Sequence, residues 1–259
     1  MSQAHHPCLC CGYRTLEKPA GYTKQICPVC AWEDTPGDAY WDGSNEVDLL
    51  SAQKHFLAAG VCEDEYLDIV RSPLPEEARS EHWLSYDELR LRIIADIERE
   101  FGDVKREEGS TLHQMWCYDS YSCDPDEIRE AALNDPEVNW QDLAPEKLSK
   151  FSESLYFLDD LGFRFYLPAF MRHVLAITDH PGINQDDLNG LISQLGGRVH
   201  ASSMHHCVPI LSTGQKQVVA AFVFLVSIAG EESQRASARS GLIRGWDAFV
   251  PDYLTAALL

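Results

Sequence analysis

Apolar residues recur at the spacing of an α-helix along most of this chain. The first predicted helix runs from about 46 to 59, begins after Asn45 as its N-cap and ends at Gly60. Its apolar face is formed by Leu49, Ala52, Phe56 and Ala59. A second amphipathic helix is predicted up to about residue 101, because Ser85 and Glu88 have the spacing of a capping box. Its apolar face is formed by Leu89, Ile93, Ile97 and Phe101.

The second half of the chain reads as a series of shorter helices around an apolar centre. Helix starts are predicted near Pro125 and Pro145, and two helices are expected to finish the chain, over about 214–229 and 234–249. Another helix is predicted over about 186–195. Aromatic residues are dense between 154 and 175, where Pro168 is expected to kink one helix or start the next. The segment 214–229 is apolar on nearly every side, which predicts the buried centre of this half.

Composition is that of a globular protein with an unusual charge. The 259 residues carry a formal net charge of −20, with a hydrophobic content of 45%. An acidic field repels nucleic-acid phosphates, so we expect no nucleic-acid partner. The same field attracts a basic protein partner.

The chain is expected to be cytoplasmic and free of membrane contact. The longest apolar stretch, 218–230, has 13 residues and is too short to cross a bilayer. The N-terminal residues lack the basic start and apolar run of a leader. Nine cysteines, an odd number, fit a reducing compartment better than a disulfide framework.

Four cysteines have the spacing of a metal site. Cys8 and Cys11 form one C-x2-C pair, and Cys27 and Cys30 form a second. Two such pairs supply the four thiolates of a closed tetrahedral zinc site. One iron ion fits the same ligands. We favour structural zinc, because no flavin or nicotinamide motif accompanies the cysteines.

Further candidate ligands accompany this set. Cys10 lies beside Cys11 and could compete as a ligand, whereas Cys62 follows the first predicted helix and is expected to be a buried apolar thiol. A second metal site is the alternative use of a histidine-rich segment, which is otherwise read as a polar loop. Its candidate ligands are His200, His205, His206 and Cys207.

Two stretches resemble known families. The runs C-L-C-C-G-Y-R-T-L and I-C-P-V-C-A-W-E-D, followed by S-N-E-V-D-L-L-S-A-Q-K-H-F-L, resemble the bacterial cysteine-rich CPCC family over about the first 80 to 100 residues. Leu9 replaces the proline of that motif, and Ala31 stands where an aromatic residue is common. This resemblance implies a small metal-binding domain without an established activity.

The run L-G-F-R-F-Y-L-P-A-F carries the second resemblance. It is similar to a bacterial family of unknown function with a Phe-Tyr-Leu-Pro-Ala-Phe motif, over roughly residue 116 to the end of the chain. This resemblance implies a compact helical domain and no known reaction.

These observations predict an α+β fold that is mostly α. A small zinc-ribbon-like domain with helices is expected over 1–104, and an all-α domain over 116–259. The linker is placed at 105–115, because residues 102–110 are charged and poor in apolar side chains.

Three functions remain open from the sequence. The favoured one is a non-enzymatic zinc protein that binds another protein, in one version an immunity-type protein that neutralises a basic partner. The second is a metal-dependent hydrolase with its metal in the segment 200–207. The third is a thiol redox or zinc sensor in which Cys10 or Cys62 exchanges with the metal ligands. No G-x-S-x-G elbow, P-loop or H-E-x-x-H motif is present to favour catalysis.

Overall fold

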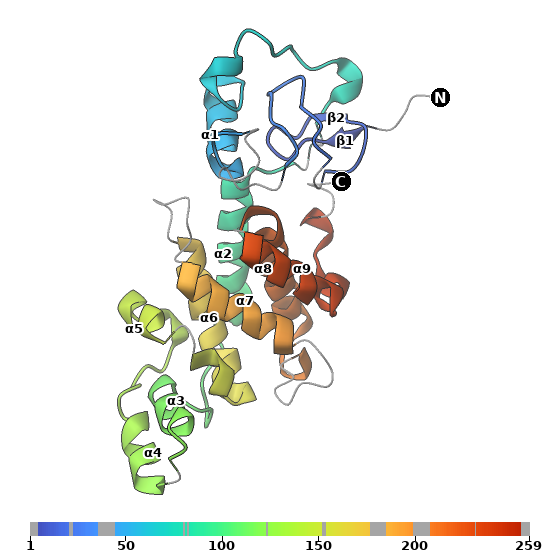
Figure 1. The fold of residues 1–259 in the computed structure, drawn as a ribbon. Coiled ribbons are helices and arrows are strands. Elements are labelled where there is room, and N and C mark those ends of the chain that lie inside the picture. Colours follow the sequence, from blue (N-terminus) through green and yellow to red (C-terminus); the bar gives the residue numbers. More distant parts are fainter. Residues whose placement is uncertain are drawn as a thin grey trace.

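The computed structural model confirms a mostly helical protein with one small sheet (Figure 1). It describes residues 5–20, 23–35, 45–79, 81, 83–122, 124–151, 154–176, 185–198, 208–230 and 232–254. Strands β1 (His6–Pro7) and β2 (Arg14–Leu16) pair antiparallel, with His6 opposite Leu16. A further antiparallel bridge joins Ile26 and Glu33, so each pair of cysteines stands at the turn of a short hairpin.

The first helix, α1 (Leu49–Ala59), starts later than predicted and has a different cap. The prediction that Asn45 is the N-cap of this helix is wrong. Asp48 holds that place and accepts a hydrogen bond from the Ser51 main-chain N–H at 2.9 Å. Asn45 instead exchanges two hydrogen bonds of 3.0 Å with the main chain of Glu33, which ties the chain before α1 to the second cysteine hairpin. Gly60 ends the helix with φ of 82°, as the sequence predicts.

Eight further helices are described along the chain. They are α2 (Tyr86–Phe101), α3 (Leu112–Asp119), α4 (Pro125–Ala132), α5 (Pro145–Lys150), α6 (Asp160–Ala176), α7 (Gln185–Arg198), α8 (Thr213–Ala229) and α9 (Glu232–Ile243). Short 3-10 turns lie between several of them. The described part of the chain contains no helix with the length and apolar character needed to cross a membrane.

The larger hydrophobic core is built around α8, as predicted. The helix packs against both α2 and α9, and nearly all of its residues from Val218 to Val226 are buried. Pro168 lies inside α6 and does not end it. The predicted helix over 234–249 is divided, because Gly245 adopts a φ of 144° between α9 and a 3-10 turn at Trp246–Phe249. That conformation favours glycine and cannot continue an α-helix.

Helix α2 contributes its apolar face to this larger core. Tyr86, Leu89, Ile93, Ile97 and Phe101 are all buried there. At its C-terminal end the buried Trp140 indole donates a hydrogen bond to the Phe101 carbonyl at 2.8 Å. The division at 105–115 into two independently folding domains stays a prediction. In the packed molecule, α2 belongs with the helices that follow it.

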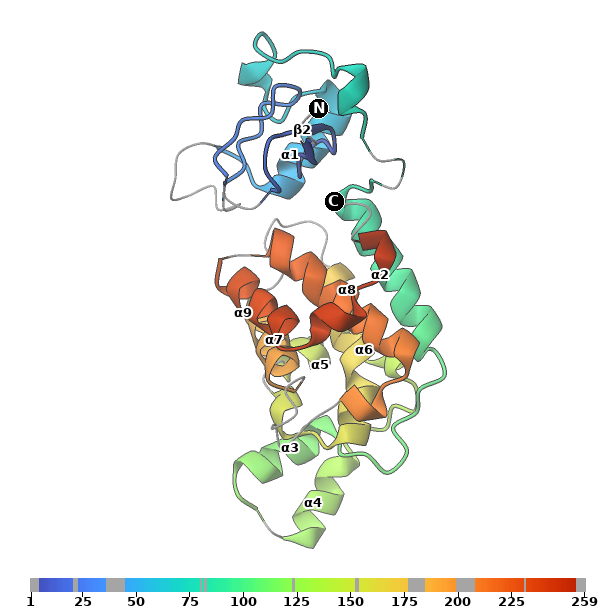
Figure 2. The same cartoon turned by 90° about the vertical axis from the view of Figure 1, so that its right-hand side faces the viewer.

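A second, smaller core surrounds the cysteine hairpins. Its buried members include Leu16, Trp32, Phe56 and Val61 together with six cysteines. Figures 1 and 2 show this N-terminal unit at one end of the molecule and the pair α3 and α4 at the other. The Gln53 amide joins the unit to the helical core, because it donates to the Leu9 carbonyl and accepts from the Tyr86 N–H, both at 2.7 Å.

Candidate metal centre

Two turns of the same design present the four cysteines. In the first turn, the Gly12 N–H donates to the Cys8 carbonyl at 2.8 Å, and the Cys8 N–H donates to the Tyr13 carbonyl at 2.9 Å. In the second turn, the Ala31 N–H donates to the Cys27 carbonyl at 2.8 Å, and the Cys27 N–H donates to the Trp32 carbonyl at 2.9 Å. Both turns therefore point their two sulfurs in a common direction from an equivalent backbone.

The residue after each C-x-x-C pair has a left-handed backbone. Gly12 has φ of 74° and Ala31 has φ of 66°. Glycine adopts this conformation freely, whereas alanine is disfavoured by about 1–2 kcal/mol. At Gly12 a second constraint applies, because a Cβ would lie 2.5 Å from Cδ1 of the buried Trp83 ring. The Trp83 ring thus covers the first turn at a distance that requires glycine.

The four sulfurs converge on one point. All four lie within 4.8 Å of one another, with Cys8 Sγ 3.7 Å from Cys30 Sγ and Cys11 Sγ 3.6 Å from Cys27 Sγ. Sulfurs bound tetrahedrally to one zinc ion at about 2.3 Å stand about 3.8 Å apart. A disulfide would bring two sulfurs to about 2.0 Å, and all four cysteines are free thiols. The spacing fits a single four-coordinate metal ion.

Burial makes the cysteine cluster dependent on a positive charge. Each of the four side chains is no more than 1% exposed. Burial raises the pKa of the Cys8 thiol, because a thiolate loses its hydration there. A bound cation reverses this and holds the sulfurs as thiolates. Thr15 Oγ1 lies 3.1 Å from Cys27 Sγ and can donate a hydrogen bond to that thiolate. Cys8, Cys11, Cys27 and Cys30 could therefore hold a metal ion as a closed site.

The two additional cysteines of the N-terminal unit lie in the same small core. Cys10 and Cys62 are buried, with 0% and 1% exposure. The Cys62 N–H donates to the Cys30 carbonyl at 2.7 Å, which fixes the residue against the second turn. Burial raises the pKa of Cys62 to about 12, so it is a thiol at neutral pH. Cys62 is therefore the buried small thiol that the sequence predicts.

The predicted second metal cluster belongs to the segment 200–207. His200, His205, His206 and Cys207 lie outside the described residues, and a metal site there stays a prediction. Among the residues that the structure does describe, the four cysteines of the two C-x-x-C pairs form the one group with metal-ligand spacing.

Sequence reasoning did not identify the residues that support the cysteine cluster. Three residues outside the C-x-x-C pairs contact the two turns. The Gln53 amide donates to the Leu9 carbonyl, the Thr15 hydroxyl lies beside the Cys27 sulfur, and the Trp83 ring covers Gly12. Gln53 gave one signal in advance, as a polar residue next to Ala52 on the apolar face of a predicted helix.

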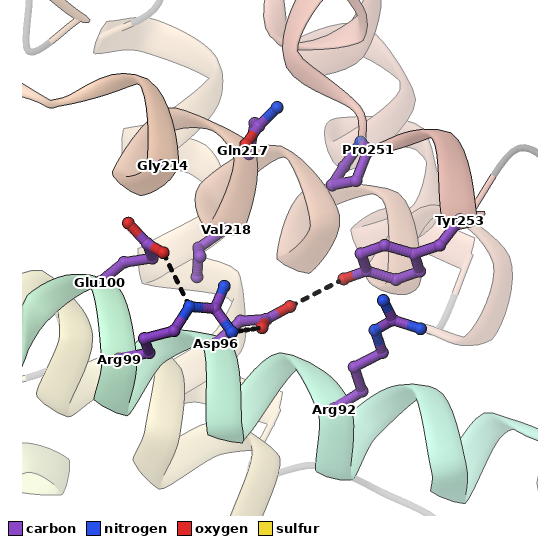
Figure 3. A pocket seen from close by; sticks show the side chains of 9 residues that line it. All are labelled: Arg92, Asp96, Arg99, Glu100, Gly214, Gln217, Val218, Pro251 and Tyr253. Atoms are coloured by element: carbon purple, nitrogen blue, oxygen red, sulfur yellow. Dashed lines mark hydrogen bonds and ion pairs between the residues drawn. The ribbon is translucent and has the colours of Figure 1, made fainter.

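A separate pocket lies between α2, α8 and the C-terminal segment (Figure 3). Its volume is about 250 Å³, and its charged groups bind mainly one another. The Asp96 carboxylate pairs with Arg99 at 2.5 Å and accepts a hydrogen bond from the Tyr253 hydroxyl at 3.2 Å. The Arg92 guanidinium lies over the Tyr253 ring at 3.7 Å. These contacts dock the C-terminal segment on α2, and we assign the pocket no ligand.

The fold and the cysteine cluster define a helical protein with an N-terminal four-cysteine unit. Comparison with models of protein families shows which families the two parts of the chain match. A model described as a family of unknown function, DUF6714, matches residues 90–250, which is more than half of the chain, and the chain belongs to that family. The cysteine-rich CPCC model matches residues 6–77. Both matches confirm the resemblances seen in the sequence, and the longer one begins inside α2.

Searches of curated proteins and of solved structures found no match to this chain.

Proposed function

We propose that this chain is a zinc-binding protein whose metal is structural and which acts by binding another protein. The observation that carries the metal assignment is the convergence of four buried sulfurs within 4.8 Å. A closed set of four thiolates leaves no open position for water or substrate, which is the arrangement of structural zinc sites. The metal would fix the two turns, and through Gln53 the turns are joined to α2.

Zinc is preferred to iron because of the chemistry around the cysteines. An iron centre of this type transfers electrons and needs a redox partner, and the sequence offers no flavin or nicotinamide motif. Structural zinc needs only the four thiolates and a packed surrounding, which Trp32, Leu16 and Phe56 provide.

The proposed partner is a basic protein in the cytoplasm. The net charge of −20 supports it, because an acidic surface accelerates encounter with a basic surface. It also argues against nucleic acid. One specific form of this proposal is an immunity-type protein that neutralises a basic toxic partner.

The two parts of the proposal are tested separately. The metal is tested by elemental analysis of protein purified without an affinity tag, with Cys30→Ser as the control that should carry none. The partner is tested by retention from an extract of the native host at low salt. Failure to retain any basic protein would contradict the binding role and leave the metal assignment intact.

A second candidate function is a redox or zinc sensor, and the observation that supports it is the position of Cys10 and Cys62 in the same small core as the four candidate ligands. Oxidation of either thiol beside the centre would disturb the cluster and release the metal. Mild peroxide should then release zinc from the wild type faster than from the double variant Cys10→Ser, Cys62→Ser. Equal release rates from the two proteins would rule out this function.

A further inference from the structure

One histidine of the helical part has its ring held by a buried carboxylate. His113 lies in the first turn of α3, and its Nδ1 stands 2.9 Å from Oδ1 of Asp135, which is wholly buried. The same carboxylate accepts from the His113 main-chain N–H at 2.8 Å and pairs with Lys147 at 3.0 Å. Burial raises the pKa of Asp135, but hydrogen bonds from His113 and Lys147 outweigh it, so the carboxyl group is ionised at neutral pH.

This carboxylate fixes the position of the proton on the imidazole. An ionised carboxylate only accepts hydrogen bonds, so neutral His113 carries its proton on Nδ1 and its lone pair on Nε2. In the described part of the chain Nε2 has no hydrogen-bond partner, and it is not among the fully buried polar atoms. The side chain is 18% exposed. A small molecule can therefore reach the lone pair of Nε2 from solvent.

Two aromatic rings and a lysine lie beside this histidine. The His113 ring stands edge-on to Trp116 at 5.4 Å and to Phe151 at 4.7 Å between centroids. Lys150, the last residue of α5, holds its ammonium 4.5 Å from the Trp116 ring centre and 5.5 Å from that of Phe151. Among the described ion pairs none involves Lys150. The imidazole and an unpaired cation thus contact the same two rings.

An oriented imidazole beside a cation is suited to receive an anionic group. The Asp135 carboxylate stabilises the positive charge that the ring gains when Nε2 forms a bond. The Lys150 ammonium offsets the negative charge of an approaching phosphoryl group. No hydroxyl or thiol of the described residues lies at hydrogen-bond distance from Nε2. His113 is therefore placed as a nucleophile in its own right, and not as the base of a serine or cysteine.

We propose that Nε2 of His113 accepts a phosphoryl group from an activated donor, an acyl phosphate or a phosphoramidate. The Nε2 lone pair forms a bond to phosphorus, and the P–O or P–N bond of the donor breaks. Its electron pair leaves with the carboxylate or with ammonia. The product is a phosphorylated imidazolium whose Nδ1–H stays hydrogen-bonded to Asp135. This site is independent of the metal centre and of the proposed protein binding, and it lies within the residues that match DUF6714.

The proposal is tested by treating the whole metal-loaded chain with phosphoramidate near neutral pH. Mass spectrometry follows the phosphorylation of each histidine with time. His55 is the internal control, because it is 33% exposed but both ring nitrogens face acceptors, the Val61 carbonyl at 2.9 Å and the Asp64 carboxylate at 3.2 Å. His113 should react at least about tenfold faster than His55. Reaction of His113 no faster than that of His55 would overturn the inference.

A second reagent separates a phosphoryl site from a histidine that is merely reactive. Lys150→Gln should slow phosphorylation of His113 about two- to fivefold, the effect of one exposed charge pair. The same variant should react at the wild-type rate with diethyl pyrocarbonate, which is neutral. Lys18→Gln removes an exposed cation from the N-terminal unit and should alter neither rate. Unchanged phosphorylation in Lys150→Gln, or equal slowing with both reagents, would contradict a site suited to a phosphoryl group.

The positioning role of Asp135 has its own spectroscopic signature. Nitrogen NMR of the wild-type imidazole should find the proton of neutral His113 on Nδ1. Asp135→Asn, assayed where circular dichroism shows it folded, should slow phosphorylation of His113 and leave that of His55 unchanged. A wild-type proton on Nε2 would refute the proposed orientation of the ring, and an unchanged rate at His113 in Asp135→Asn would refute its activation by the carboxylate.

Discussion

The contact between the Gly12 turn and the Trp83 ring gives a sharp test of how the N-terminal unit is built. In Gly12→Ala the new Cβ would lie 2.5 Å from Trp83 Cδ1 and 2.6 Å from two further ring atoms. The left-handed backbone costs alanine about 1 kcal/mol. Displacing a buried ring to relieve overpacking costs about 1–3 kcal/mol more. We therefore expect Gly12→Ala to lower the free energy of unfolding of this unit by about 2–4 kcal/mol.

Gly60 provides the matched control for this substitution. It has a similar φ of 82°, but a Cβ there would meet no atom within 4 Å. Gly60→Ala should therefore cost only the backbone term, about 1 kcal/mol. Urea unfolding of the metal-loaded proteins, followed by tryptophan fluorescence, measures both variants. Equal destabilisation by the two would refute the steric role of Trp83.

Three further substitutions test other parts of the account. Ala31→Gly should stabilise the metal-loaded unit by roughly 0.5 kcal/mol in urea unfolding, because the left-handed backbone costs alanine more than its buried methyl group contributes; a destabilised variant would contradict this. Cys30→Ser should abolish metal binding and the tertiary fold of the N-terminal unit, while far-UV circular dichroism keeps most of the helical signal; loss of that signal would show that the two cores fold as one. Asp135→Asn should destabilise the helical core by about 3 kcal/mol, because the buried Asp135 carboxylate binds both His113 Nδ1 at 2.9 Å and Lys147 Nζ at 3.0 Å. Burial alone would raise the pKa of Asp135, but hydrogen bonds from His113 and Lys147 outweigh it and hold that pKa below its ordinary value. The stabilisation is therefore present above about pH 4 and is lost as the pH falls through the lowered pKa. If acid lowered the Tm of Asp135→Asn as much as that of the wild type, this role of Asp135 would be contradicted.

Local patterns in the sequence predicted most of the helices and the convergence of the four sulfurs. Two-residue spacing turns both sulfurs of a pair toward one point whatever surrounds them, so Cys8, Cys11, Cys27 and Cys30 could be chosen without a structure. The capping box of Ser85 and Glu88 starts α2 for the same reason, since both partners lie within one helical turn.

Interactions between distant residues could not be predicted in this way. The apolar face of α2 shows that the helix is buried somewhere, but only its packing with α8 assigns it to the larger core. Asn45 and Asp48 are both good N-caps, and Glu33, far away in sequence, decides between them by binding Asn45.

The central claim is that four buried thiolates hold one structural zinc ion, and metal content per chain tests it most directly. Elemental analysis of untagged protein should find one zinc per chain in the wild type and none in Cys30→Ser. A wild-type protein without metal, or one with iron in place of zinc, would contradict the claim. Zinc retained in full by Cys30→Ser would contradict it as well, and would direct attention to His200, His205, His206 and Cys207.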